Sequence, residues 1–219
     1  EPTEISTNLY LGEDRACIPY AFYLSEKGIR GGGITLWPGY GPAIIYAKNE
    51  IERIREALNI EVLPEIQESY YKGLYIECFS CLEQFLCDFV LCGIYNVKGC
   101  YEKAEQFRSG KEKDNQKNDV HTFYFKFVYH KFDVVSKMFS RVLGIQLPDM
   151  GYFTQQNDIR NDIVHRTSLT KKDRMTYRHI NKSDVVEMVE HIDCLLRDLS
   201  IYSGSTYEEI ESIIMNHKK

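Results

Sequence analysis

The fold of this chain is decided by residues 66–92, IQESYYKGLYIECFSCLEQFLCDFVLC. Apolar side chains recur there in steps of three and four, the spacing that gathers residues on one face of an α-helix. The first apolar stripe consists of Ile66, Tyr70, Leu74, Cys78, Cys81, Phe85, Phe89 and Cys92. The second stripe consists of Tyr71, Tyr75, Leu82, Leu86 and Val90. A helix that is apolar on two faces is buried among other helices, so the segment predicts the central helix of a bundle.

One acidic residue, Glu83, lies in the middle of this helix, between Leu82 and Phe85. A buried carboxylate is costly unless it is paired. We therefore expect Glu83 either to pair with an arginine from another element or to reach the rim of the core.

Most of the chain after residue 61 also has a helical pattern. Residues 122–143 predict a second long helix that Gly144 ends, and residues 152–165 predict a third. A last long helix follows with Ser183 as its N-cap, and residues 207–215 predict a short one. The charged residues 99–119, by contrast, predict a surface loop or a frayed helix.

The first sixty residues differ from the rest in their pattern of residue types. Residues 18–46 mix aromatic and β-branched residues with glycine and proline, a pattern that predicts turns between one or two short strands. The string GGGITLWPGYG, residues 31–41, matches neither glycine-rich phosphate-binding motif, and Pro38 and Pro42 each remove an amide that could bind phosphate. A short helix over residues 49–58 closes this section.

These patterns predict two parts. Residues 1–60 form an N-terminal extension with short strands and one short helix, and residues 61–219 form a helical domain. The predicted fold class is mainly α, an antiparallel bundle of four to five helices with a small β-containing extension.

Composition excludes several classes of protein. With 43% hydrophobic residues the chain is not intrinsically disordered. No run approaches eighteen apolar residues, so we expect no membrane span, and the polar start EPTE is unlike a secretory signal. Seven cysteines, an odd number with four of them between residues 78 and 92, favour thiols packed in a core over a disulfide framework or a metal site. We therefore expect a reducing compartment, the cytoplasm.

Charge is unevenly distributed. The net charge of −5 argues against a protein that coats nucleic acid through bulk charge. Residues 166–182, however, contain six basic residues and one acid, a local net charge of +5. A basic island in an acidic protein points to a local site for an anion.

The third predicted helix ends in DIRNDIVHR, residues 158–166. Asn161 and His165 are four residues apart and share a helix face, and the long side chain of Arg160 reaches toward them. This trio suits a phosphodiester, because an imidazole moves a proton and a guanidinium binds and stabilises phosphate oxygens. No acid-rich metal cage is evident, so a metal-free route through the RNA 2′-hydroxyl fits. The alternative is structural: Arg160 pairs with an acid such as Glu83, and His165 merely ends a helix.

The string RNDIVHR, residues 160–166, resembles the Arg-x4-6-His signature of the HEPN superfamily of all-helical domains, many of which are metal-independent endoribonucleases. A polar residue follows the arginine in that signature, and Asn161 supplies it. The earlier helix with a mid-helix acid and the helix after the signature are also similar. The resemblance covers about residues 61–200 and is strongest to stand-alone bacterial defence and toxin families such as the RiboL-PSP-HEPN group.

The resemblance implies a homodimer in which two copies of the signature share one cleft, with Arg160, Asn161 and His165 as the catalytic set and no metal or cofactor. The RNA products would carry 2′,3′-cyclic phosphate ends. The protein would act as a toxin or in defence against phage. Its partners would be RNA and an antitoxin or regulatory protein. The rival reading is a non-catalytic HEPN module that binds RNA or a partner protein. Thr167 stands where members controlled by tyrosine modification have tyrosine, so that control is not expected.

The basic island gains a role beside this site. Its cations are expected to contact phosphates that flank the scissile bond, and Tyr177 to stack on a base. The segment is expected to leave the helical pattern as a small hairpin or excursion, and the alternative to RNA contact is a solvated surface loop. Asp162 and Arg166 are expected to form a surface pair of little energetic consequence. The predicted substrate-binding residues are Arg166, Lys171, Lys172, Arg174, Tyr177 and Arg178.

Overall fold

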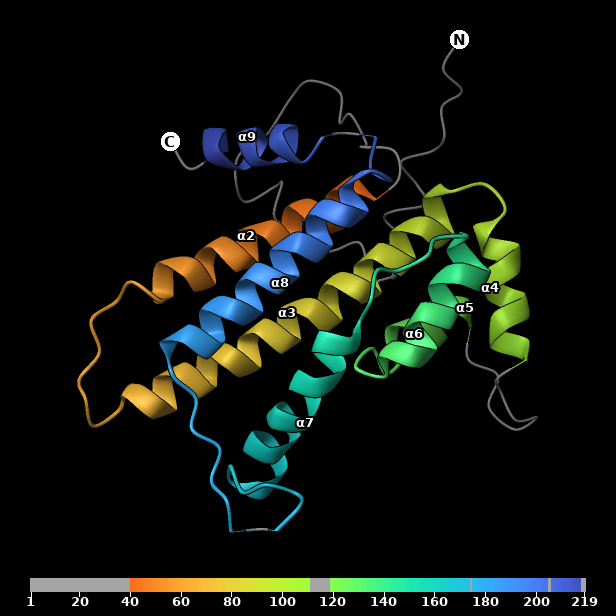
Figure 1. Cartoon of the computed structure of the whole chain (residues 1–219). Coiled ribbons are helices and arrows are strands. Elements are labelled where there is room, and N and C mark those ends of the chain that lie inside the picture. The colour runs from red at the N-terminus through yellow and green to blue at the C-terminus, as the bar shows by residue number, and fades with distance from the viewer. Residues whose placement is uncertain (1–39, 111–118, 174, 205, 218–219) are drawn as a thin grey trace. The chain divides into compact units, whose positions relative to one another are not determined.

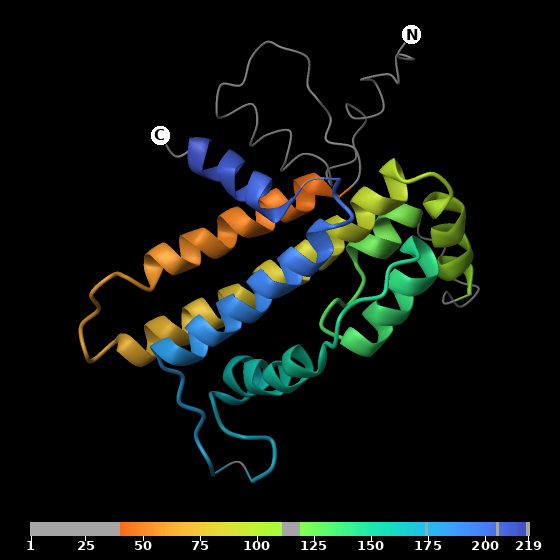
Figure 2. The same ribbon diagram turned by 45° about the horizontal axis from the view of Figure 1, so that its top comes forward.

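The computed structural model of the chain describes residues 40–110, 119–173, 175–204 and 206–217. The described part is mainly helical and contains no strand, which confirms the mainly α class of the prediction. Three long helices lie side by side, α2 (Gly41–Ala57), α3 (Gln67–Asn96) and α8 (Lys182–Ser200), as Figures 1 and 2 show. The predicted strands before residue 40 lie outside the described residues.

The central helix is α3, as the two apolar stripes predict. Its core-facing residues from Leu74 to Ile94 are buried, whereas Ile66, before its first turn, is 54% exposed. By length and composition α3 is also the only described helix that would be able to cross a membrane. Other parts of the protein bury 67% of its most apolar window, as in the core helix of a globular protein.

Helix α2 begins earlier than its sequence pattern indicates. The helix expected over residues 49–58 starts at Gly41, so residues 41–46 are helical and not extended. Pro42 stands in the first turn, where its missing N–H has no intrahelical partner to lose. Ile44 and Ile51 of α2 are fully buried, and α2 contacts both α3 and α8. The helical bundle therefore includes residues that precede 61.

A group of short helices packs at the C-terminal end of α3 (Figure 1). They are α4 (Cys100–Ser109), α5 (Val120–Phe125), α6 (Phe132–Met138) and the π-helical turn η2 (Phe139–Leu143). Two expectations are corrected here. The charged stretch from residue 100 to 109 is a helix, because Ala104 and Phe107 give it a buried side. The single helix expected over 122–143 is broken.

The break lies between Phe125 and Phe132. The Tyr129 hydroxyl, within it, donates to the backbone oxygen of Tyr124 at 2.9 Å, and both tyrosines are buried. The turn therefore places aromatic side chains from both sides in one core, which a continuous helix would separate. Gly144 ends η2 with a φ of 72°, a left-handed conformation that suits glycine.

The last part of the chain carries α7 (Gly151–Arg166), a non-helical connection, α8 and α9 (Tyr207–His217). These agree with the predicted helices over 152–165 and 207–215. The N-cap of α8, however, is Asn181 and not Ser183. The Asn181 side chain accepts from the backbone of Asp184 at 3.4 Å, and the Asp184 carboxylate accepts from the backbone of Asn181 at 2.8 Å. This capping box satisfies the free amides at the helix start.

A buried charge network joins α2, α8 and α9. Nζ of Lys48, whose side chain is 4% exposed, lies 2.7 Å from the Asp193 carboxylate, 3.2 Å from Glu52 and 3.0 Å from Glu211. The Tyr207 hydroxyl donates to the same Asp193 oxygen at 2.5 Å. Burial opposes ionisation of Asp193, but hydrogen bonds from Lys48 and Tyr207 outweigh it and lower the pKa of the carboxyl.

The cysteines of α3 behave as small apolar core residues, as predicted. Cys78, Cys81 and Cys87 of α3 are buried as thiols, as is Cys100 of α4, whereas Cys92 of α3 is half-buried. Desolvation raises the pKa of Cys81 and of Cys87 to about 12. Groups of three or more side chains able to hold a metal ion are absent from the described residues.

Candidate functional site

Two of the three signature residues meet on α7. Nη1 of Arg160 donates to Oδ1 of Asn161 at 3.1 Å, and both side chains are half-buried. His165 lies one turn further on and is exposed. Within the described residues no hydrogen bond or ion pair joins His165 to Arg160 or to Asn161. The structure of one chain therefore brings the arginine and the amide together and leaves the imidazole free.

Glu83 reaches the rim of the core, the second of its two expected positions, and has no arginine partner among the described residues. Oε1 of Glu83 lies 3.2 Å from Nδ1 of His130, and each side chain is just under one third exposed. Arg160 instead has one hydrogen bond to Asn161, and its Nε is buried with no acceptor among the described residues. A buried donor without a partner costs about 1–3 kcal/mol. Arg160 therefore keeps an unused donor beside the signature.

Asn157, one turn earlier on α7, also has a buried polar atom without a hydrogen-bond partner among the described residues. Its Oδ1 is buried without a donor among the described residues, while Nδ2 donates to the backbone oxygen of His130 at 3.5 Å. An unused acceptor at Asn157 and an unused donor at Arg160 are three residues apart, a spacing that places them on neighbouring positions of a helix surface.

Asp162 accepts hydrogen bonds from three residues of the site, and the sequence pattern did not predict its burial. The predicted surface pair with Arg166 exists, at 2.8 Å between Oδ1 and Nη1, but the Asp162 side chain is 3% exposed. The same oxygen accepts from the backbone N–H of Lys171 at 3.1 Å. Oδ2 lies 3.4 Å from Nε of Arg178. Asp162 is therefore a buried hub that joins α7 to the connection that follows it.

The chain turns sharply at the end of α7. Thr167 and Ser168 have φ values of 52° and 68°, left-handed conformations that are strained for residues other than glycine. Both backbone N–H groups donate to the carbonyl oxygen of Asp162. The hydrogen bonds that end the helix therefore also fold the next residues back over its last turn.

The connection forms a small hairpin, one of the alternatives that its sequence predicts. Leu169 and Tyr177 form an antiparallel bridge. The backbone N–H of Thr170 donates to Thr176 at 2.9 Å, and that of Arg178 donates to Ser168 at 2.7 Å. These contacts define residues 168–178 as the basic hairpin.

The tip of the basic hairpin is held by Asp173. Its carboxylate accepts from the backbone N–H groups of Met175 and Thr176 and from the hydroxyls of Thr170 and Thr176, at 2.7–3.0 Å. Hydrogen bonds from the Thr176 and Met175 backbone lower the pKa of the Asp173 carboxyl. The only acid of the basic island therefore shapes the turn.

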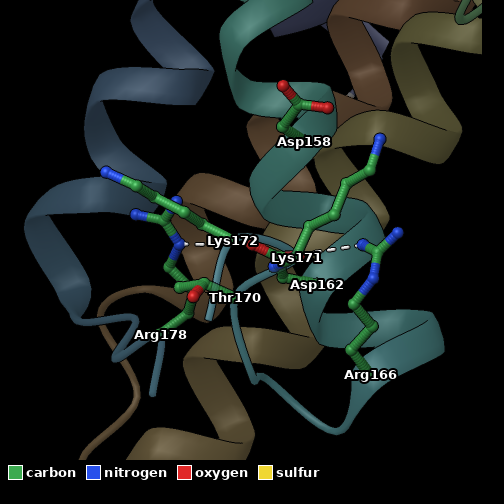
Figure 3. A pocket seen from close by; sticks show the side chains of 7 residues that line it. All are labelled: Asp158, Asp162, Arg166, Thr170, Lys171, Lys172 and Arg178. Atoms are coloured by element: carbon green, nitrogen blue, oxygen red, sulfur yellow. Dashed lines mark hydrogen bonds and ion pairs between the residues drawn. The ribbon is translucent and has the colours of Figure 1, made fainter. Parts of the chain in front are cut away.

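A pocket of about 420 Å³ opens between α7 and the basic hairpin (Figure 3). Figure 3 shows Arg166 and Arg178 reaching Asp162 from opposite sides, with the side chains of Lys171 and Lys172 extending away from each other. Four of the six predicted substrate-binding residues line this pocket. Its full lining is Asp158, Asp162, Arg166, Thr170, Lys171, Lys172 and Arg178.

The other two predicted substrate-binding residues are not in the pocket. Arg174 lies outside the described residues. Tyr177 packs on α3, where its hydroxyl accepts from Nζ of Lys72 at 2.5 Å and its ring centroid lies 4.1 Å from the same nitrogen. Tyr177 therefore anchors the hairpin, although 42% of the residue remains exposed.

The signature residues do not line this pocket, because they occupy a neighbouring strip of α7. Asp158, Asp162 and Arg166 are spaced by four and face the hairpin, whereas Asn161 and His165 follow the adjacent strip. The spacing of the two acids was visible in the sequence, but the burial of Asp162 depends on the fold-back after Arg166. No family model matches this chain, and neither a curated protein nor a solved structure shows significant similarity to it.

Proposed function

We propose that this protein is a metal-independent endoribonuclease of the HEPN type. The observation that carries the proposal is the pairing of Arg160 with Asn161 on α7, which uses Nη1 and leaves Nη2 without an acceptor among the described residues. A phosphate oxygen is the ligand that a guanidinium with spare donors binds best. The cationic pocket begins on the next strip of the same helix.

The chemistry needs one base, one acid and one group that stabilises negative charge. His165, exposed at the end of α7, would take the proton of the ribose 2′-hydroxyl. The 2′-oxygen forms a bond to phosphorus, and the bond from phosphorus to the 5′-oxygen breaks. An imidazolium, from a second His165, would protonate that leaving oxygen. The products are a 2′,3′-cyclic phosphate and a 5′-hydroxyl.

Arg160 would hold the non-bridging oxygens of the scissile phosphate, where charge builds up in the transition state. Asn161 fixes the guanidinium through its 3.1 Å hydrogen bond. Since His165 does not contact these two residues in one chain, we propose that two chains form a homodimer whose signatures face one cleft. Such a dimer supplies both the acid and the base.

The proposed biological setting is the cytoplasm, in a toxin or anti-phage role under the control of an antitoxin or regulatory protein. The cationic pocket supports RNA as the partner, because it places four cations beside the signature helix. A second candidate function is a non-catalytic module that binds RNA or a partner protein. The separation of His165 from Arg160 within one chain favours that alternative if the protein is a monomer.

The test uses the full-length chain with cellular RNA in EDTA. Wild type is compared with His165→Ala and with Arg160→Ala, and Lys103→Ala on α4 serves as the control for loss of a surface cation. Cleavage by wild type and by the control, with cyclic phosphate ends and with loss in both signature variants, supports the proposal. Binding of RNA without cleavage in any variant favours the non-catalytic module.

A further inference from the structure

We propose that Asp162 is a positioning residue that builds a phosphate-binding subsite from Arg178 and Arg166, one strip away from the signature. The inference rests on the proposed function for the identity of the ligand, a phosphate of single-stranded RNA next to the scissile one. It assigns to Asp162 a role that differs from a surface ion pair.

Each guanidinium contacts Asp162 through only one of its nitrogens. Arg178 uses Nε, at 3.4 Å, so both of its terminal nitrogens remain available. Arg166 uses Nη1, at 2.8 Å, and keeps Nη2 and Nε. Neither guanidinium has another hydrogen-bond partner among the described residues. Two planar groups are thus held by one carboxylate with their remaining donors unused, an arrangement that suits bidentate binding of phosphate.

The position of Asp162 makes this arrangement rigid. The Asp162 side chain is 3% exposed, and its carboxylate accepts a hydrogen bond from the backbone N–H of Lys171. The backbone carbonyl of Asp162 also accepts hydrogen bonds from the N–H groups of Thr167 and Ser168. Arg178 is fixed further, because its backbone N–H donates to Ser168. Binding therefore orders fewer side chains, and pre-ordering of this kind strengthens affinity.

The charge of the pocket identifies an anion as the ligand. Arg166, Arg178, Lys171 and Lys172 contribute four positive charges, and Asp158 and Asp162 contribute two negative ones. Asp162 is shared by the two arginines, and the exposed Lys171 and Lys172 form no ion pair among the described residues. The cations that line the pocket therefore exceed its acids and repel one another, and a bound phosphate relieves that repulsion.

A purely structural role for Asp162 predicts something different. In that case the two arginines serve only to close the hairpin, and any residue that keeps the hairpin closed keeps RNA affinity. If they form a subsite, affinity depends on the shape of the guanidinium. Lysine at position 178 keeps the charge but lacks the planar fork, so Arg178→Lys separates the two cases.

The experiment measures binding of a 2′-O-methyl RNA 10-mer, which cannot be cleaved, by the full-length chain at several salt concentrations. The variants are Arg178→Lys, Arg178→Ala and Asp162→Asn, and Lys103→Ala is the matched control. We expect Kd to rise about tenfold for Arg178→Lys and for Asp162→Asn, and to change less than about twofold for the control. The slope of log affinity against log salt should flatten by about 0.7 for Arg178→Ala, the value of one phosphate contact on a single strand.

Wild-type affinity in Arg178→Lys, or no binding by wild type at low salt, overturns the subsite. If Asp162→Asn unfolds, as near-ultraviolet circular dichroism would report, the Arg178 variants alone decide. The proposed nuclease fails separately: binding of the 10-mer with the expected variant pattern, but no cleavage of unmodified RNA, removes the catalytic function and keeps the subsite. Cleavage that is insensitive to Arg178→Lys, with unchanged KM, keeps the nuclease and removes the subsite.

Discussion

Oδ2 of Asp162 lies 3.4 Å from Nε of Arg178, sixteen residues further along the chain, and this pair closes the basic hairpin onto the end of α7. The contact joins the helix that carries the signature to the segment that carries the positive charge. It also sets the geometry of the pocket, because the second oxygen of the same carboxylate holds Arg166.

Replacement of His165 by alanine should abolish RNA cleavage without affecting stability. A side chain that transfers a proton in the transition state contributes about 10²–10⁴-fold to rate. His165 is exposed, so its loss should change the free energy of unfolding by less than about 0.5 kcal/mol. Single-turnover cleavage and urea unfolding measure the two quantities. Full activity in this variant would remove His165 from the mechanism.

Arg160→Lys should lose most of the activity although it keeps the charge. Lysine cannot donate from a planar fork, and it cannot both reach the Asn161 amide and grip a phosphate in the same way. We expect a loss of about 10²-fold or more in kcat, comparable with removal of one donor to a developing oxyanion. Steady-state cleavage of a defined RNA, with circular dichroism to verify folding, provides the measurement. Activity near the wild-type value would contradict the role of the guanidinium.

Asp162→Ala should destabilise the protein by about 2 kcal/mol. The substitution leaves the Lys171 amide and two guanidiniums without their acceptor. The arginine side chains are 30% and 42% exposed, so solvent screens part of the loss and the effect stays below that of a fully buried pair. Urea unfolding gives the value, and Asp158→Ala, on the exposed turn before it, serves as the control. An effect no larger than the control's would show that Asp162 is not a structural hub.

Lys48→Met should cost about 3 kcal/mol or more of unfolding free energy. It removes the cation that faces Asp193, Glu52 and Glu211 and leaves the buried Asp193 with fewer partners. Arg53→Ala on the same helix removes a cation that is 68% exposed and should change stability by less than about 0.5 kcal/mol. Thermal and urea unfolding measure the stability of both variants. Equal losses of stability in the two would show that the ion pairs of Lys48 contribute nothing.

Asp88 on α3 should make the protein less stable as the pH rises from about 4 to 6. Burial raises the pKa of its carboxyl from 3.8 to about 6, so the folded state binds more protons than the unfolded state in this window. Stability linked to this group is therefore present below pH 4 and lost by pH 6, with an upper limit of about 3 kcal/mol. Asp88→Asn, which keeps an acceptor for Gln84, should be more stable than wild type at pH 7 and equal to it near pH 4. Parallel unfolding curves at the two pH values supply the check, and a constant difference would contradict the assignment.

A homodimer is expected from the resemblance of residues 160–166 to the HEPN signature. Multi-angle light scattering of the full-length chain gives its molar mass directly. A mass twice that of the 25.6 kDa chain agrees with a shared cleft. A monomer at high concentration would contradict a composite active site and favour the binding module.

Apolar periodicity by itself determined the helical class, the central position of α3 and the extents of α7 and α9. Leu74, Cys78, Phe85 and Phe89 recur with a helical period, and such a pattern needs no knowledge of distant residues. The signature could likewise be found in the sequence, because Arg160, Asn161 and His165 lie within six residues of one helix. The basic island was also visible, because charge is a local property of composition.

Tertiary structure decided everything that depends on contacts between distant residues. The break between α5 and α6 follows from a core shared by Tyr124 and Tyr129, and the partner of Glu83 is His130, which lies in the turn between these two helices. Asp162 is the clearest case. Its spacing from Arg166 is that of an exposed helix pair, and only the return of the chain through Thr167 and Ser168 brings Lys171 and Arg178 to it and removes it from water. Burial is a property of what folds over a side chain, and spacing within one helix does not contain it.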